Sequence, residues 1–177
     1  MSLCDMTAGY NDRVCTNGKG GIKSVLIFPV SNIINSAVVS NQITTLTVSG
    51  ETFRYKLKSN LSSYTAPVKV NKDNGTLFYE ESLSMILASD TKELRAQLHL
   101  LAQNLVVALV ENADGSIVAL GFGEGLQVAD ANEYTSGVLK GDRKGHVIVL
   151  NGMENEPVPD VTAAIFATLV GQTSPSV

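Results

Sequence analysis

The chain has 177 residues, enough for one domain with a hydrophobic core, and a formal net charge of -4. Its Lys and Arg residues are scattered, so the basic clusters that bind nucleic acid tightly are missing. Only 17% of the residues are charged, against about 25% in a typical soluble domain, which favours a surface partly covered by partners. A neutral surface rich in Ser, Thr and Asn is the alternative explanation.

The first third of the sequence predicts an arm followed by strands. Residues 1–21 are irregular and end in a glycine-rich joint, and they lack the basic and apolar blocks of a signal peptide. Ile22–Pro29 is a predicted strand, and its continuous apolar run Val25–Phe28 indicates burial on both faces. Ile33–Gly50 is rich in residues that favour strands, and Thr52–Leu57 alternates like a half-buried strand. No apolar stretch is long enough to cross a membrane.

A long hairpin and one helix are predicted next. Asn74-Gly75 is typical of a type I′ turn, in which both central residues take positive φ. We expect the outgoing strand to continue to Leu87, with a bend or bulge near Glu80–Ser82. Asp90 and Glu93 form a capping-box-like pair in front of apolar residues at helical spacing, which predicts one helix with a single buried face.

The second half of the chain adds further strands. Leu105–Val110 and Ile117–Gly121 form a second predicted hairpin around the Asn112–Gly115 turn, and His146–Leu150 is a terminal strand. Residues 22–160 therefore predict a mainly β domain. We expect a β-barrel or sandwich of two packed sheets, with one flanking α-helix at about residues 90–104 and a long hairpin extension. Residues 161–177 form a partly apolar extension, which we expect to pack on a neighbouring subunit.

The residues that could carry chemistry form no recognisable catalytic or cofactor site. Gly121-Phe-Gly-Glu-Gly125 lacks the following helix that a dinucleotide loop requires, and Glu124 would place a negative charge against a phosphate. Close backbone packing or a bulge is the preferred interpretation of this loop. Glu80 and Glu81 are adjacent in a strand, so they point to opposite faces and do not form an acid/base pair.

The cysteines and histidines do not predict a metal site. Cys4, Cys15, His99 and His146 lack the closely spaced pairs of structural zinc ligands. A Cys4–Cys15 disulfide would stabilise the chain by roughly 3 kcal/mol, but free thiols are expected in a reducing compartment. His99 falls off the apolar stripe of the predicted helix and is expected in solvent. We therefore expect no enzyme activity, no cofactor and no metal.

Several segments, taken in order, resemble the tail-tube protein family of tailed phages, whose fold is related to the tubes of contractile injection machines and type VI secretion. Val68-Lys-Val-Asn-Lys-Asp-Asn-Gly-Thr-Leu-Phe-Tyr-Glu-Glu81 resembles the family's long hairpin, and Asp90–Asn104 resembles its single helix. Leu105–Gly115 resembles the hairpin that follows. Gly141–Glu154 and Glu156-Pro-Val-Pro159 resemble the closing strand and its acidic, proline-rich end. Two departures are a missing aromatic residue in the strand after Gly115 and a C-terminal tail longer than the family's.

The resemblance implies a structural subunit that assembles as stacked, six-fold rings into a hollow tube and conducts DNA without binding it. The strands around Val68–Val70 and Leu77–Met85 would line or flank the lumen. The Asn71–Gly75 tip and the Lys58–Thr65 loop would reach a neighbouring ring. The expected subunit-interface residues are Lys58, Ser59, Asn60, Tyr64, Val68, Val70, Asn71, Asp73, Asn74, Gly75, Leu77 and Tyr79.

The resemblance also implies partners and a location. The partners would be copies of the chain itself, the tail terminator, the hub or baseplate, a sheath in contractile tails, and the tape measure in the lumen. The protein would be made in the host bacterial cytoplasm and reside in the virion tail, without contact to a membrane. Two alternatives stay open: a terminator, hub or neck protein that forms single rings, and a monomeric β-barrel with an apolar pocket for a small ligand.

Overall fold

The computed structural model describes residues 19–57, 61–130 and 132–174. Most of the expected N-terminal arm, with Cys4 and Cys15, therefore lies outside the described residues. The elements in chain order are β1 (Ile22–Pro29), the 3-10 turn η1 (Val30–Asn32), β2 (Ile33–Val39), β3 (Gln42–Val48), β4 (Phe53–Lys56), β5 (Ser63–Thr65), β6 (Val68–Asn71), β7 (Thr76–Leu87), α1 (Lys92–Ala102), β8 (Val106–Asn112), β9 (Ile117–Leu120), β10 (Gln127–Val128), β11 (Glu133–Thr135), β12 (Gly145–Glu154), β13 (Asp160–Val161) and α2 (Ala163–Val170).

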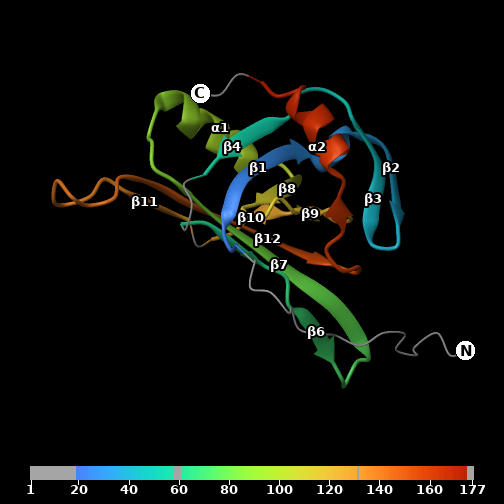
Figure 1. Cartoon of the computed structure of the whole chain (residues 1–177). Helices are drawn as coiled ribbons and strands as arrows, with labels where there is room; N and C mark the ends of the chain where they lie inside the picture. The colour runs from blue at the N-terminus through green and yellow to red at the C-terminus, as the bar shows by residue number, and fades with distance from the viewer. Residues whose placement is uncertain (1–18, 58–60, 131, 175–177) are drawn as a thin grey trace, which may run out of the picture.

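Two sheets pack against each other, and the strands cross over between them along the chain (Figure 1). The seven-stranded sheet has the order β2-β3-β13-β9-β8-β1-β4. In the six-stranded sheet β12 and β7 pair at the centre, β10 and β11 pair with β12, and β5 and β6 pair with β7. The predicted fold class is confirmed in its sandwich form, since the described strands do not close into a barrel.

Strand β1 separates two hydrophobic cores, as its continuous apolar sequence predicts. Val25 and Ile27 face the six-stranded sheet and pack in the same core as Met85. Leu26 and Phe28 point to the opposite side and belong to the second core. Successive side chains of a strand alternate between faces, so the part of β1 that is buried on both sides, Val25–Phe28, is apolar at each position.

The segment Ile33–Gly50 forms a hairpin that the sequence pattern did not reveal. β2 and β3 pair antiparallel up to Val39 and Gln42, and the two residues between them, Ser40 and Asn41, have φ of 51° and 60°. Positive φ at both central positions defines the type I′ turn, whose twist matches that of the flanking strands. The turn lacks the glycine that usually signals it, and this explains why it was missed.

The predicted hairpin around Asn74-Gly75 is present, but its turn differs from the prediction. The β6–β7 ladder ends at the pair Asn71–Thr76, so residues 72–75 form the connection, and among the residues of this connection only Gly75 has positive φ. The Asn71 side chain closes the loop by accepting hydrogen bonds from the backbone N–H groups of Asp73 and Asn74. The expected bulge is also wrong: β7 and β12 pair without interruption from Tyr79 to Leu87.

Helix α1 lies where its apolar spacing predicts, but another residue caps it. The N-cap is Thr91, whose hydroxyl accepts a hydrogen bond from the Leu94 N–H at 3.1 Å. Asp90 instead points to β11 and β12, where its carboxylate contacts Tyr134 and His146. His99 is exposed on the solvent side of the helix, as its position off the apolar stripe predicts.

The C-terminal residues complete the domain. β13 lies between β3, which it pairs in parallel, and β9, which it pairs antiparallel. α2 follows and buries Phe166 and Leu169 in the second core, on the face of the seven-stranded sheet that points away from the other sheet. The expectation that this run packs on a neighbouring subunit is therefore wrong. The apolar residues of 161–170 cover the chain's own sheet, and the expected domain boundary at residue 160 falls inside β13.

Candidate functional site

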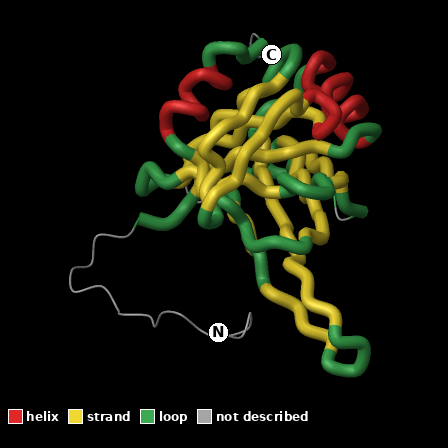
Figure 2. Tube along the Cα trace, turned by 90° about the vertical axis from the view of Figure 1, so that its right-hand side faces the viewer, coloured by secondary structure: helices red, strands yellow, loops and turns green. Residues whose placement is uncertain are grey.

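The outer part of the β6–β7 hairpin projects from the body of the domain (Figure 2). The ladder pairs Val68 with Tyr79 and Val70 with Leu77. Directly paired residues lie on the same face, and so do residues two positions apart along a strand. Val68, Val70, Leu77 and Tyr79 therefore form one apolar face, which we call the hairpin overhang. The exposed fractions of Val70 and Leu77 are 59% and 52%.

The overhang continues the core-facing side of the six-stranded sheet. Along β7 the buried side chains alternate, and they include Leu83, Met85 and Leu87, which pack in the core between the sheets. The same alternation places Leu77 and Tyr79 on this side, at the end of the strand where the burial pattern turns to exposed. An inner sheet face thus extends beyond the part of the domain that covers it.

The opposite face of the hairpin carries Lys69, Thr76 and Glu80 together with the half-buried Phe78, which pairs with Lys69. Lys69 Nζ and Glu80 Oε2 form an ion pair of 3.4 Å on this side, and both side chains are about half exposed. Thr76 also lies on this face, one residue before Leu77 in the strand. The hairpin is therefore a two-stranded ribbon with one wholly apolar face and one face that is mainly polar apart from Phe78.

The structure brings together some of the predicted interface residues and separates others. The four overhang residues share one face, and Asn71, Asp73, Asn74 and Gly75 form the tip beyond them. Tyr64 lies on β5, packs against the core between the sheets and accepts a hydrogen bond from Asn112 Nδ2 at 3.4 Å. Lys58, Ser59 and Asn60 lie outside the described residues. The predicted surface is thus reduced to the projecting hairpin.

A second arrangement involves the glycine loop after β9. The backbone N–H groups of Gly123, Glu124 and Gly125 donate to Glu154 Oε1 at 3.1, 2.8 and 3.2 Å. The donors that a bound phosphate would need are therefore taken by a carboxylate of the same chain. A Cβ atom at Gly121 would lie 2.6 Å from Leu126 Cγ. The preferred interpretation of the loop as close backbone packing is confirmed.

Glu81 lies beside the same loop and was not predicted as buried. It is 1% exposed, and its Oε2 accepts a hydrogen bond from the Gly121 N–H at 2.6 Å. Burial raises the pKa of Glu81 to about 7, the Gly121 hydrogen bond opposes this, and the Glu154 carboxylate adds to it. Glu80 points to the opposite face and is exposed, so the two adjacent carboxylates do not act together, as predicted.

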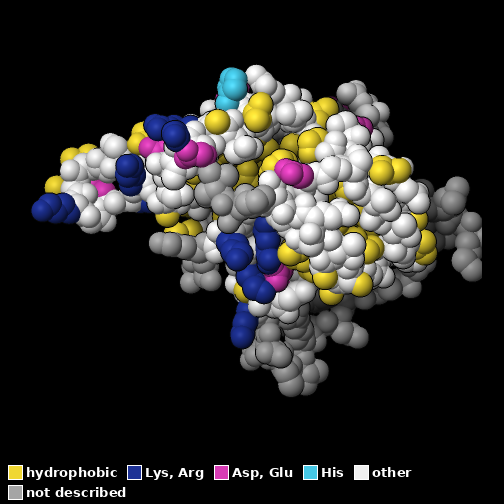
Figure 3. All heavy atoms as spheres, turned by 90° about the horizontal axis from the view of Figure 1, so that it is seen from above, with side chains coloured by type: hydrophobic (Ala, Val, Ile, Leu, Met, Phe, Trp, Pro, Cys, Tyr) yellow, Lys and Arg dark blue, Asp and Glu magenta, His cyan; other side chains and the backbone are white. Residues whose placement is uncertain are grey.

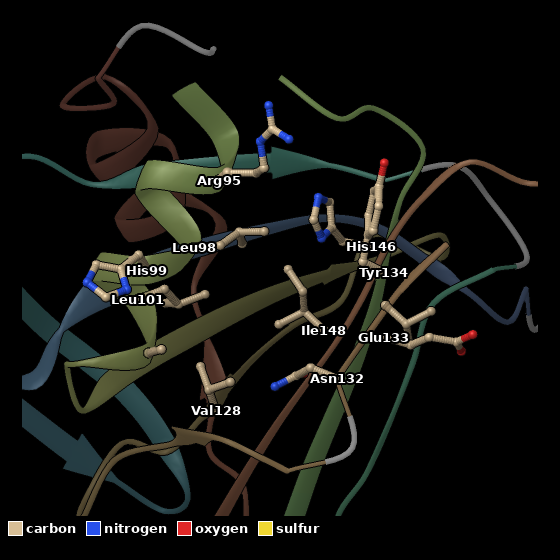
Figure 4. Close-up of a pocket in the computed structure, with 12 residues that line it drawn as sticks. Arg95, Leu98, His99, Leu101, Val128, Asn132, Glu133, Tyr134, His146 and Ile148 are labelled. Carbon is tan, nitrogen blue, oxygen red and sulfur yellow. The ribbon is translucent and has the colours of Figure 1, made fainter. Parts of the chain in front are cut away.

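A groove of about 420 Å³ separates α1 from β11 and β12 (Figure 4). At one end Asp90 accepts a hydrogen bond from the Tyr134 hydroxyl at 3.0 Å and lies 3.2 Å from His146 Nε2. The contact with His146 is the main reason that the pKa of Asp90 is lowered. Arg95 Nε lies 3.6 Å from the same carboxylate. The lining residues include no Ser, Thr or Cys that could act as a nucleophile.

Within residues 19–57, 61–130 and 132–174, no group of three or more His, Cys, Asp or Glu side chains is arranged to hold a metal ion. In that same part of the chain, no helix combines the length and the apolar character needed to span a membrane.

The fold and the site define a two-sheet β-sandwich with a projecting amphipathic hairpin. No family model, curated protein or solved structure matches this chain. The phage tail-tube resemblance therefore rests on the ordered segments quoted above and stays a prediction.

Proposed function

We propose that this chain is a structural subunit of a phage tail tube, which assembles as stacked, hexameric rings into a hollow conduit for DNA. The observation that carries the proposal is the hairpin overhang. Val68, Val70, Leu77 and Tyr79 present an apolar face that is the continuation of a core-facing sheet surface. An identical neighbour in a ring can cover this face and extend the sheet around an axis.

The energetics favour a covered overhang. An isolated two-stranded ribbon is marginally stable in water. Full burial of a Val or Leu side chain is worth about 1.5–3 kcal/mol, so covering the half-exposed Val68, Val70 and Leu77 contributes about 3 kcal/mol per subunit. The contribution recurs at each contact of a closed ring, which favours assembly over an isolated subunit.

The outward face of the six-stranded sheet supports the conduit part of the proposal. Residues 82–86 of β7 and 147–151 of β12 pair at the centre of this sheet and include no charged side chain. Glu133 pairs with Val147 at the edge of the same face. A neutral to acidic surface does not hold phosphate groups, so DNA can pass along it without binding. In this setting the other tail proteins are the chain's partners, and the virion tail is its location.

A related ring protein of the tail terminator, hub or neck is the alternative within the same class. It would use the same overhang for contacts within one ring but would not stack into a tube. The small-ligand alternative would use the open groove beside α1, because the space between the two sheets is filled by core side chains.

The test is assembly of the purified protein, followed by negative-stain microscopy and light scattering. Leu77→Lys places an ammonium group on the overhang, and Thr76→Lys places the same group on the opposite face one residue away. Both positions are exposed, so both variants should fold. We expect hollow filaments from the wild type and from Thr76→Lys, and at least an about tenfold higher assembly concentration for Leu77→Lys.

The other outcomes separate the alternatives. Discrete rings that do not stack would support the terminator or hub. A wild-type protein that stays monomeric at high concentration would overturn the proposal, and so would a Leu77→Lys variant that assembles as readily as Thr76→Lys.

A further inference from the structure

The loop between β11 and β12, residues 136–144, carries the most exposed apolar side chains among the described residues. Val138 is 95% exposed and Leu139 is 73% exposed. Lys140, Arg143 and Lys144 lie on the same loop and are also exposed. Figure 3 shows this projection at the left of the molecule, with dark blue basic groups beside yellow apolar ones. We call residues 136–144 the basic loop.

The basic loop is held in one conformation. Asp142 Oδ2 accepts hydrogen bonds from the N–H groups of Val138 and Leu139 at 2.8 and 2.7 Å, and its own N–H donates to the Leu139 carbonyl oxygen at 3.0 Å. Gly137 has φ +73°, and a Cβ atom there would lie 3.0 Å from Asp142 Cβ. A preorganised loop loses less conformational entropy when it binds than a flexible one does. Two apolar side chains are thus presented to solvent on a rigid turn.

A surface groove of about 440 Å³ lies near the opposite end of β12. Its walls combine two acidic side chains, Glu80 and Glu124, with two exposed apolar ones, Leu105 and Met153. Its lining residues include no Lys or Arg, although Lys69 Nζ lies 3.4 Å from the Glu80 carboxylate and Asn155 Nδ2 donates to Glu124 Oε1 at 2.8 Å. Gly125 also lines it, where the hydrogen bonds to Glu154 hold the glycine loop in place. We call this the acidic groove.

The two features are complementary in charge and in polarity. The basic loop has apolar side chains next to cationic ones, and the acidic groove has apolar side chains next to carboxylates. A groove of this volume is in the range that accepts a drug-sized ligand, so it has room for two branched side chains. The groove beside α1 fits the basic loop less well, because Arg95 and His99 line it.

A chain cannot fill its own acidic groove. The basic loop precedes Gly145 at the start of β12, and Met153 lies near the end of that 10-residue strand. At about 3.3 Å per residue the two are separated by roughly 25–30 Å along one rigid strand. A loop at one end and a groove at the other make a head-to-tail contact between copies, which closes into a ring or continues as a filament.

We propose that the basic loop of one copy inserts into the acidic groove of the next copy, with Val138 and Leu139 packed against Leu105 and Met153. The inference rests on the proposed function, since it names a contact within the assembly. Glu80 and the overhang residues lie on opposite faces of β7, so the groove and the overhang can be covered at the same time. The groove shares only Asn151 with the stretches 82–86 and 147–151 that are proposed to face the conduit.

Site-specific disulfide formation tests this contact. In a background with Cys4→Ser and Cys15→Ser, one batch carries Leu139→Cys and a second carries Met153→Cys. Both replaced side chains are more than half exposed, so neither change should disturb folding. After mixing, assembly and mild oxidation, we expect a cross-linked dimer in the mixture, and at least about tenfold less in either batch alone.

Charge reversal provides a second readout. Lys140→Glu with Lys144→Glu should raise the assembly concentration about tenfold, and Glu124→Lys should raise it in the same way, because each places like charges across the contact. Glu80 is left unchanged because it pairs with Lys69 of its own hairpin. In a mixture of the two variants every contact between unlike copies pairs opposite charges, so the mixture should assemble more readily than either variant alone.

The failures are distinguishable. If the wild type assembles but the mixture gives no cross-link, the inferred contact is wrong and the tail-tube proposal stands. If the wild type does not assemble at all, both are overturned.

Discussion

Ionisation of Glu81 should weaken the fold as the pH rises. This carboxyl is buried in the core-facing surface of β7, and its pKa is raised from 4.5 to about 7, mainly by burial. The folded protein therefore holds the proton more tightly than the unfolded chain does. The contribution of Glu81 to stability is therefore greatest below about pH 4.5, decreases as the pH rises towards 7, and is constant above that range.

The magnitude follows from the pKa difference. The interval between 4.5 and about 7 corresponds to about 3 kcal/mol, at about 1.4 kcal/mol for each tenfold change in proton affinity. A loss of this size is a large fraction of the free energy of unfolding of a small domain, about 5–15 kcal/mol. The substitution Glu81→Gln removes the ionisation and keeps an oxygen that can accept the Gly121 hydrogen bond.

The assay is urea unfolding at a fixed protein concentration and a series of pH values between about 5 and 8. We expect the free energy of unfolding of the wild type to fall by about 2.5 kcal/mol relative to that of Glu81→Gln across this range, because part of the loss has already occurred at pH 5. Glu80→Gln is the matched control, because it removes a carboxylate from the adjacent exposed position and should keep the wild-type profile. Parallel profiles for the wild type and Glu81→Gln would refute the reasoning.

Three further predictions concern packing and turns. Gly121→Ala should lower the free energy of unfolding, measured with urea, by about 2–3 kcal/mol, because the added Cβ meets Leu126. Gly115→Ala, also at positive φ but in open space, should lower it by about 1 kcal/mol. Equal losses would contradict the close packing at Gly121. Phe166→Ala should destabilise the isolated subunit by about 3–5 kcal/mol, because α2 covers the chain's own core, and an unchanged urea midpoint would count against that packing. Gly75→Val should impair assembly, or the order of the hairpin measured by hydrogen exchange, whereas Asn74→Val should not, because Gly75 has positive φ and Asn74 does not. A larger effect of Asn74→Val than of Gly75→Val would instead support the type I′ turn.

The elements that were predicted correctly are those whose structure is determined by the residues of the element itself. The apolar run of β1, the helical spacing of α1 and the Asn112–Gly115 turn each determine their structure within a few residues. α2 was missed because its run of small and apolar residues fits an extension that binds a partner as well as a helix that covers its own sheet. That choice depends on the position of β13, which is set by contacts far apart in the sequence.

The candidate site was predictable in part. The burial of Glu81 could have been found, because it occupies an alternate position between Tyr79 and Leu83 on the core-facing side of β7. Its contact with the glycine loop could not, because it requires the relative placement of the two sheets. The hairpin overhang was predicted as an extension, but its apolar face became evident only with the pairing of Val70 and Leu77.

The parallel pairing of β13 with β3 has a consequence for the order in which the domain folds. The residues that β13 joins, Asp160 with Gln42 and Val161 with Ile43, are far apart in the chain, and folds dominated by such pairings form slowly. During synthesis, the ribosome makes β3 long before β13 and α2. The seven-stranded sheet therefore stays incomplete until the last elements emerge, and the facing edges of β3 and β9 stay unpaired until then.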